Sequence, residues 1–410
     1  MKYKNLKLEN GLTIYAIDFE DSSNVASVNV FYKVGSKDEY MPKSGIAHFL
    51  EHLSFKSTKK HKAGEFDAIL KSFGASNNAC TSFDYTQYYA LSKSDKIEKI
   101  LSLYADMMDL LEFKEEEFYS ERDVICEEER LRVKNDPFGK AYFTLYNNAF
   151  INHPYHWTPI GFSDDIANLS IEDVRQFYNT FYAPNNAYVV ICGDIDIDYC
   201  LKITKELFKD KKSKEIPTKN VDTSYSNYSK KIELDYKESN TNILLQGYKL
   251  PSINSKDVIY MSALATFLNM PKMSKIQNDL LDKKRIFSEI EFYSSLNKFD
   301  NLFIVIACNQ EAIKEKDTEL LYKYLKNIKL NKNDILCINN HFNLKINEVK
   351  SNCSSFAKHF GMYLCLDRLD IFEEFLSSFC YDLAYFNDII SKYFVDNNLT
   401  QVLLRRQDEK

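Results

Sequence analysis

Two histidines and a glutamate lie close together early in the chain, in the pentapeptide HFLEH at positions 48–52. On a helix, His48 and His52 are four residues apart and share one face, so both imidazole rings can reach one metal ion. Neutral imidazole is a good zinc ligand. Glu51 lies on the neighbouring part of that face, where its carboxylate can take a proton from a water molecule at the metal. The order H-x-x-E-H, the reverse of the more common H-E-x-x-H, predicts a zinc site that activates water.

A catalytic zinc site needs a third protein ligand and an open position for water. An acidic run, ERDVICEEE at 121–129, offers Glu121, Glu127, Glu128 and Glu129. The run lies in a stretch predicted to be helical, where positions 121 and 128 share a face. Acidic runs on helices are usually solvated faces, and single histidines are usually structural. With only seven histidines in the chain, however, chance rarely produces H-x-x-E-H, so the metal interpretation is preferred.

The elements that must position these residues follow from hydrophobic spacing and turn residues. The helix that carries the H-x-x-E-H motif is predicted at 44–56, with Ser44 as its N-cap. The acidic run falls in a helix predicted at 114–133. The other predicted elements of the first half are strands at 12–17, 26–34, 77–91 and 188–192, and helices at 64–73, 96–111, 140–148 and 171–181.

The second half of the chain repeats this pattern of elements. A Lys- and Ser-rich stretch predicts a linker at 213–230 between an N-terminal domain at 1–212 and a C-terminal domain at 231–410. Helix, Asn-Asn turn and strand follow one another at 173–190 and again at 388–403, which indicates a duplicated chain. The other elements predicted in the second half are strands at 231–236, 243–248 and 302–308, and helices at 258–269 and 276–284.

Composition limits the class of protein. A chain of 410 residues is long for one core, and 45% hydrophobic with 27% charged residues is an ordinary globular balance. The net charge of −6 argues against nucleic acid as the main partner. We expect no membrane helix, since no apolar stretch of about 18 residues occurs, and no secretory signal. Nine scattered cysteines without a C-x-x-C pair favour reduced thiols and a cytoplasmic location.

Several short motifs, taken in order, resemble the M16 or pitrilysin-type metallopeptidase family, which includes mitochondrial processing peptidase and insulin-degrading enzyme. The motifs are NGLT at 10–13, GIAHFLEH at 45–52, NACTS at 78–82, YY at 88–89, ERDVI at 121–125, NN at 185–186 and GD at 193–194. The resemblance implies a zinc-dependent endopeptidase, with Zn²⁺ as its cofactor, that hydrolyses extended or unfolded peptides.

Roles of individual residues follow from the same resemblance. It selects Glu128 as the third zinc ligand beside His48 and His52. It also implies that Glu51 is the catalytic base and that Glu121 is a second, supporting catalytic carboxylate. Asn78 and Ala79 match positions on a strand that binds the substrate backbone, by strand addition at a sheet edge.

The fold implied by the resemblance is α+β, with two similar domains arranged like a clam shell. Each domain has a mostly antiparallel sheet backed by helices, as in mitochondrial processing peptidase. Two such chains pair around a hollow chamber, so the resemblance implies a homodimer or a heterodimer with a related subunit.

The second half departs from the family pattern. Active members carry an Arg and a Tyr there that help to hold the substrate and the oxyanion. In the best match, which begins at Ser274, Asp282 stands at the Arg position and Glu289 at the Tyr position. An acid there repels a developing oxyanion. The chain is then either active by itself, or active only with a partner subunit that supplies the Arg and Tyr, or a non-catalytic peptide-binding scaffold. The intact Glu51 argues against a scaffold.

Overall fold

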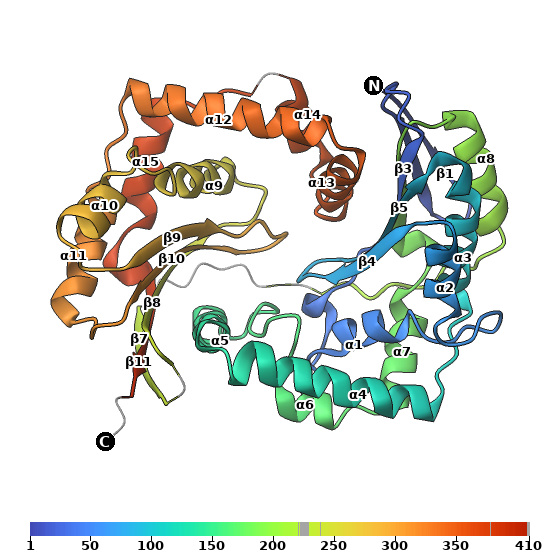
Figure 1. Cartoon of the computed structure of the whole chain (residues 1–410), viewed down its shortest axis with the longest axis horizontal. Helices are drawn as coiled ribbons and strands as arrows, with labels where there is room; N and C mark the ends of the chain where they lie inside the picture. Colours follow the sequence, from blue (N-terminus) through green and yellow to red (C-terminus); the bar gives the residue numbers. More distant parts are fainter. Residues whose placement is uncertain (220, 222–228, 238, 378, 408–410) are drawn as a thin grey trace. The chain divides into compact units, whose positions relative to one another are not determined.

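The computed structural model describes residues 1–219, 221, 229–237, 239–377 and 379–407. These residues form two compact units, each with one sheet backed by helices (Figure 1). The first unit comprises Met1–Glu128, Trp157–Asn220 and Asn347–Glu373, and the second comprises Glu129–His156, Val221–Ile346 and Glu374–Lys410. The expected mixed fold with two helix-backed sheets is therefore confirmed. The domain boundaries at 212 and 231 stay a prediction, because these compact units are discontinuous along the chain.

The sheet of the first unit has six strands in the order β1-β2-β6-β3-β5-β4. Only β2 and β6 run parallel. The strands are β1 (Lys2–Lys7), β2 (Thr13–Asp18), β3 (Val25–Tyr32), β4 (Ser76–Thr81), β5 (Thr86–Lys93) and β6 (Ala187–Gly193). The helices with most or all of their residues in this unit are α1 (Ile46–Leu53), α2 (Glu65–Ser72), α3 (Ile97–Asp109), α4 (Glu115–Glu129), α6 (Ser163–Ala167), α7 (Ile171–Phe181), α8 (Ile197–Phe208), α13 (Cys353–Cys365) and α14 (Leu369–Ser377).

The helix α13 belongs to the first unit although it lies late in the chain. It packs on β3 and β6 of the first sheet. Gly361 of this helix contacts the ring of Phe31 so closely that an added Cβ atom would lie 2.0 Å from the ring. The absence of a side chain at position 361 therefore lets the helix approach the sheet.

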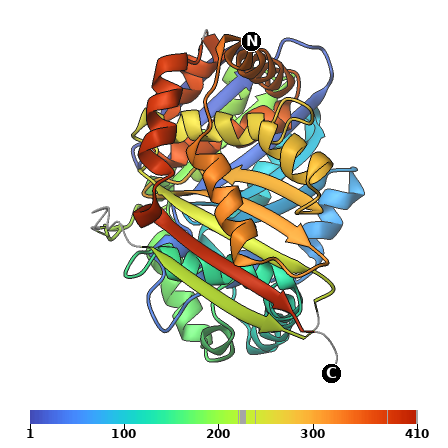
Figure 2. The ribbon, with the colours of Figure 1, turned by 90° about the vertical axis from the view of Figure 1, so that its left-hand side faces the viewer.

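The sheet of the second unit has five strands in the order β7-β11-β8-β10-β9, seen side by side in Figure 2 with β11 in red. Only β7 and β11 run parallel. The strands are β7 (Lys230–Tyr236), β8 (Asn242–Leu250), β9 (Glu289–Ser294), β10 (Asn301–Asn309) and β11 (Leu399–Arg406). The remaining helices are α5 (Pro137–Ala149), α9 (Lys256–Leu268), α10 (Lys275–Gln277), α11 (Glu315–Lys326), α12 (Lys332–Lys350) and α15 (Leu383–Tyr393).

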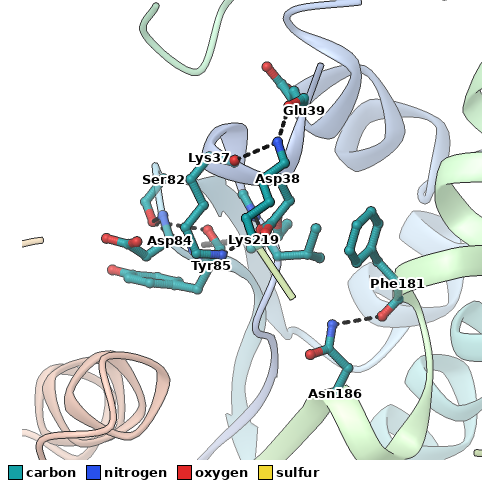
Figure 3. A network of polar contacts seen from close by, with 12 residues as sticks. Lys37, Asp38, Glu39, Ser82, Asp84, Tyr85, Phe181, Asn186 and Lys219 are labelled. Atoms are coloured by element: carbon teal, nitrogen blue, oxygen red, sulfur yellow. Dashed lines mark hydrogen bonds and ion pairs between the residues drawn. The ribbon is translucent and has the colours of Figure 1, made fainter. Parts of the chain in front are cut away.

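The two sheets repeat one strand order, which confirms the predicted duplication. The series β2-β6-β3-β5-β4 corresponds to β7-β11-β8-β10-β9, and β1 is an addition to the first. The Asn-Asn turns are also equivalent. The side-chain amide of Asn186 donates to the Phe181 carbonyl at 3.0 Å, as drawn in Figure 3, and that of Asn398 donates to the Tyr393 carbonyl at 2.9 Å. In both halves this bond ties the turn to the C-terminal end of the preceding helix.

The single strand predicted at 77–91 is wrong, because the structure has a hairpin there. β4 and β5 pair antiparallel, and the turn between them is closed by the Ser82 amide, which donates to the Tyr85 carbonyl at 2.8 Å. The Ser82 hydroxyl also accepts from the amides of Asp84 and Tyr85, both at 3.1 Å. The segment is rich in Thr and Tyr, which favour strands, so the sequence pattern did not reveal a turn that depends on one serine side chain.

Ser44 is not the N-cap of the metal-motif helix. The helix begins after Gly45, which has a φ of 85°, and Ser44 instead donates to Asp165 at 2.6 Å. Two predicted helices also end differently, in π-helical turns. α4 stops at Glu129 before the turn at Arg130–Lys134, and the helix predicted at 276–284 is the short α10 followed by such a turn at Asn278–Lys283.

Part of the predicted linker is packed on the first unit. Residues 220 and 222–228 lie outside the described residues. Before them, the Lys214 amide donates to the Asn185 side chain at 3.0 Å. Figure 3 shows that the Lys219 amine donates to the main-chain carbonyls of Lys37, at 3.0 Å, and Glu39. Residues 213–219 therefore follow the surface of this unit through specific contacts.

Candidate metal centre

A buried glutamate holds the start of α1, the helix that carries the H-x-x-E-H residues. The Glu39 carboxylate accepts from the amides of Gly45 and Ala47, both at 2.9 Å, and from the Trp157 indole at 2.6 Å. It thus satisfies first-turn N–H groups that have no partner inside the helix. Burial raises the pKa of Glu39 to about 8, although these three donors lower it. Sequence reasoning missed this residue because it lies six residues before Gly45.

Two histidines of α1 and one glutamate of α4 form the candidate metal site. Phe49 of α1 stacks on Phe118 of α4 with ring centroids 4.9 Å apart, which fixes the two helices together. One ligand atom each from His48, His52 and Glu128 lies within 4.8 Å of the other two. A carboxylate oxygen of Glu128 lies 3.9 Å from Nε2 of His48 and 3.4 Å from Nε2 of His52.

These distances suit a zinc ion. In a tetrahedral zinc site with ligand distances of 2.0–2.1 Å, the ligand atoms lie about 3.3 Å from one another. The three side chains would therefore need to move only slightly to bind the ion. Two imidazoles and one carboxylate are also a donor set found in catalytic zinc sites. The residues present therefore fit the metal implied by the family. Of the acids left open by the sequence, Glu128 approaches the Nε2 atoms of both histidines.

Glu121 stands behind the candidate ligands. Its carboxylate lies 3.3 Å from Nδ1 of His52, and its other oxygen pairs with Lys56. Burial raises the pKa of Glu121, but His52 and Lys56 outweigh burial, so the pKa lies below its usual value. Burial lowers the pKa of His52, but hydrogen bonds to Glu121 and Glu128 outweigh it and raise the pKa to about 9. Metal binding to His52 therefore displaces a proton.

Glu51 points from α1 toward the end of β4. The residue is buried, 9% exposed, and its carboxylate accepts from the Thr81 hydroxyl at 2.5 Å. Burial raises the pKa of Glu51, while the hydrogen bonds from Thr81 and the charge of His52 lower it. A carboxylate with a raised pKa is suited to exchange protons near neutral pH. Thr81 and Lys56 are contacts that sequence reasoning missed, although Thr81 lies in the NACTS motif.

The structure places the two predicted substrate-binding residues on the edge strand of the first sheet. Asn78 is exposed and Ala79 is half-buried, and they lie two and three residues before Thr81 on β4. The Ala79 amide donates to the Asn78 side chain at 2.9 Å. No contact of either residue with His48, His52 or Glu128 is present among the hydrogen bonds and ion pairs described. They belong to the neighbouring strand edge and not to the ligand set.

Asp282 and Glu289, which the family resemblance places at the Arg and Tyr positions, both lie in the second unit. Asp282 is exposed in the π-helical turn after α10, and Glu289 is exposed at the start of the edge strand β9. Neither carboxyl is drawn into the interior of this unit.

Family models cover most of the chain. The model described as "Insulinase (Peptidase family M16)" matches residues 16–157, and the one described as "Peptidase M16 inactive domain" matches residues 168–334. The chain belongs to the M16 family of peptidases. Within this M16 chain, the candidate site lies in the part matched by the first model.

Individual relatives agree with the family. A curated protein of Helicobacter pylori named "Zinc protease PqqE" is 37% identical, over 98% of this chain and 93% of its own length. The crystal structure of a protease from Helicobacter pylori matches with a TM-score of 0.94 at 35% identity, covering 98% of this chain and 99% of that chain. A structure of a peptidase M16 inactive domain from Pseudomonas fluorescens, 13% identical with a TM-score of 0.88 over 100% of this chain and 99% of that one, shows the fold alone.

In the part of the chain that the structure describes, no helix combines the length and the apolar character that crossing a bilayer requires.

Proposed function

We propose that this M16 chain is a zinc-dependent endopeptidase that hydrolyses extended or unfolded peptides. The observation that carries the proposal is the convergence of His48, His52 and Glu128, with the buried carboxylate of Glu51 one residue before His52. A site that only held a metal for structure would have no use for a proton acceptor beside it. Relatives named zinc proteases support the same chemistry.

Each residue then has a distinct role. Zinc, when bound, supplies a Lewis acid that polarises the peptide carbonyl and acidifies water. His48, His52 and Glu128 would hold it. Glu51 accepts a proton from the attacking water and passes it to the departing amine, a task favoured by a raised pKa. Glu121 fixes the ring of His52 through Nδ1, and such outer partners strengthen metal sites.

Peptide substrates are proposed to add along β4. This strand is the last in the order of the first sheet and pairs with β5 on one side. Main-chain hydrogen bonds to a strand edge give affinity with little demand on sequence. Asn78 and Ala79 lie in the middle of that edge.

A second candidate function rests on the acids at positions 282 and 289. By the family resemblance, Asp282 and Glu289 occupy the positions of an Arg and a Tyr in active members, and a related partner subunit would then supply those two groups. We propose a dimer in either case, of two copies or of two related subunits. The family description "inactive domain" for residues 168–334 also leaves a peptide-binding scaffold as an alternative.

The proposed location is the cytoplasm, without a nucleic-acid or membrane partner. One structural neighbour is a periplasmic protease of Escherichia coli, which matches with a TM-score of 0.79 at 18% identity, covering 99% of this chain and 48% of that chain, and shows the fold alone. Fractionation of cells that produce the tagged chain tests the location.

The deciding experiment compares the purified zinc-loaded chain with its Glu51→Gln variant on a mixture of unstructured peptides. We expect the variant to bind zinc in the same stoichiometry and to lose turnover by about 10²–10⁴-fold, the contribution typical of a general base. Retained turnover in the variant would exclude Glu51 as the base. A folded, zinc-bound wild type that cleaves nothing alone would point to the partner-subunit alternative, and activity on adding the related subunit would establish it.

A further inference from the structure

We propose that Thr81 is a positioning residue that holds the carboxylate of Glu51 at the end of the β4 edge, so that one strand aligns both the peptide and the proton acceptor. The inference rests on the proposed function for its catalytic meaning. The positioning of Glu51 by Thr81 can be tested separately from catalysis.

Thr81 binds Glu51 through its side chain. Its hydroxyl donates to the carboxylate at 2.5 Å. Glu51 sits on α1 and Thr81 is the last residue of β4, thirty positions later, so this bond joins the metal-motif helix to the sheet edge. Because the carboxylate is buried, few other donors can compete for it.

The register of the hairpin determines which way the main-chain groups of Thr81 face. Ser82 and Tyr85 form the hydrogen-bonded pair that closes the turn. In an antiparallel ladder, bonded and non-bonded pairs alternate, so the next pair, Thr81 with Thr86, does not exchange main-chain bonds. The main-chain groups of Thr81 therefore point away from β5, toward the outer edge.

The same alternation of bonded and non-bonded pairs determines which main-chain groups of β4 face an added peptide strand. Asn77 and Ala79 occupy further non-bonded pairs, with Ala90 and Tyr88, so their N–H and C=O groups also face the outer edge. An added strand would pair with these two residues and would replace the Asn78 side chain as the acceptor of the Ala79 amide. One step on, about 6.7 Å further along, the Thr81 hydroxyl holds the Glu51 carboxylate. This places the proton acceptor directly beyond the residues with which the peptide would pair.

A purely structural role for the Thr81 side chain predicts different behaviour. Val has nearly the shape of Thr and would fill the same space, so packing alone would survive a Thr81→Val change. The hydroxyl bond to Glu51 would be lost. Thr86→Val is a matched control, because Thr86 lies opposite on β5 and its hydroxyl donates to the Val34 carbonyl at 2.9 Å.

The kinetic test uses the full zinc-loaded chain and an unstructured reporter peptide. For Thr81→Val we expect kcat to fall about 10- to 100-fold with KM within about twofold and zinc content unchanged, since a displaced catalytic group loses rate and not binding. Thr81→Ser should restore most of the loss, and Thr86→Val should keep kcat within about twofold. An unchanged kcat in Thr81→Val overturns the proposal.

The structural test needs no turnover. Crystal structures of the wild type, Thr81→Ser and Thr81→Val should show Glu51 in one shared conformer in the first two and displaced or split in the third. A single unmoved Glu51 in Thr81→Val overturns the positioning role even if kcat falls. If Glu51 moves as expected but the wild type cleaves no peptide, the positioning stands and the proposed function alone fails.

Discussion

The two sheets share one strand order, yet the helices beside their edge strands carry different chemistry. α1 follows β3 and packs beside β4, and α9 follows β8 and packs beside β9. α1 presents His48, Glu51 and His52, whereas α9 has no histidine and its one acid is Asp257 in the first turn. Ten of the thirteen residues of α9 are buried, most of them apolar. The two copies therefore share a scaffold, and among the described residues the candidate ligand set lies in the first copy.

A buried acid near the start of each helix shows the same divergence. Glu39 uses its carboxylate to hold α1, through the amides of Gly45 and Ala47. Asp257 accepts from the Tyr385 hydroxyl at 2.5 Å, from the Lys392 amine at 2.8 Å and from the Tyr393 hydroxyl. Burial raises the pKa of both acids, but at Asp257 the lysine and the tyrosines outweigh burial and lower it. The hydrogen-bond donors to Glu39 are all neutral, whereas Asp257 accepts from a lysine amine as well as from two tyrosine hydroxyls.

The largest expected effect is on metal binding, and it tests whether only the first half holds the ion. We expect Glu128→Gln to weaken zinc binding by more than about 100-fold, because even outer partners of metal ligands are worth 10–100-fold. Zinc content after dialysis, measured by mass spectrometry, checks this. Glu116→Gln, an exposed position on the same helix, is the control and should keep full occupancy. Zinc retained in Glu128→Gln would mean that another acid, or the second half, supplies a ligand.

A smaller effect separates stability from metal binding. Asp257→Asn should lower the free energy of unfolding by about 1–3 kcal/mol, since the donors around the buried carboxylate lose their anionic acceptor. Zinc occupancy should not change. Differential scanning calorimetry with zinc analysis checks both quantities, and Asp388→Asn, an exposed position in the same unit, is the control. Loss of zinc from Asp257→Asn would show that metal binding in the first half depends on the packing around Asp257 in the second.

The smallest effect is a difference in pH dependence. The raised pKa of Glu39, about 8, means that the folded state binds its proton more tightly than the unfolded state. Its contribution to stability is therefore full below the unfolded pKa, about 4.3, and is lost as the pH rises through 8. Asp257, with a lowered pKa, behaves oppositely, and its contribution is lost as the pH falls through its folded pKa.

Melting temperatures of the metal-free wild type and Glu39→Gln variant test this sign. Between pH 5 and pH 8, the wild type should lose at least about 2 °C relative to the variant, which cannot titrate at this position. For Asp257→Asn, the wild-type advantage should instead shrink from pH 5 toward pH 3. If the melting temperature of the wild type instead rises relative to that of Glu39→Gln as the pH increases, the three donors keep the Glu39 carboxylate ionised throughout.

Local patterns predicted much of the fold. The helix α7 has the predicted bounds, Ile171–Phe181, because its apolar spacing is local and Ser170 caps it at the residue directly before Ile171. The repeated Asn-Asn turn was likewise visible, since each turn bonds to the helix five residues before it. The hairpin at 76–93 was not, because its turn depends on one serine side chain within a uniform strand pattern.

By itself the sequence determined that His48, Glu51 and His52 could face one metal ion, because the period of a helix is fixed over five residues. Sequence spacing left four acids open as the third ligand, and the family resemblance selected Glu128. Only the tertiary structure decided which carboxylate lies against both rings, that Glu39 starts α1, that Thr81 holds Glu51, and that α13 joins the first sheet. These contacts join residues that are distant along the chain or on separate elements, so they depend on how the elements pack and not on any local period.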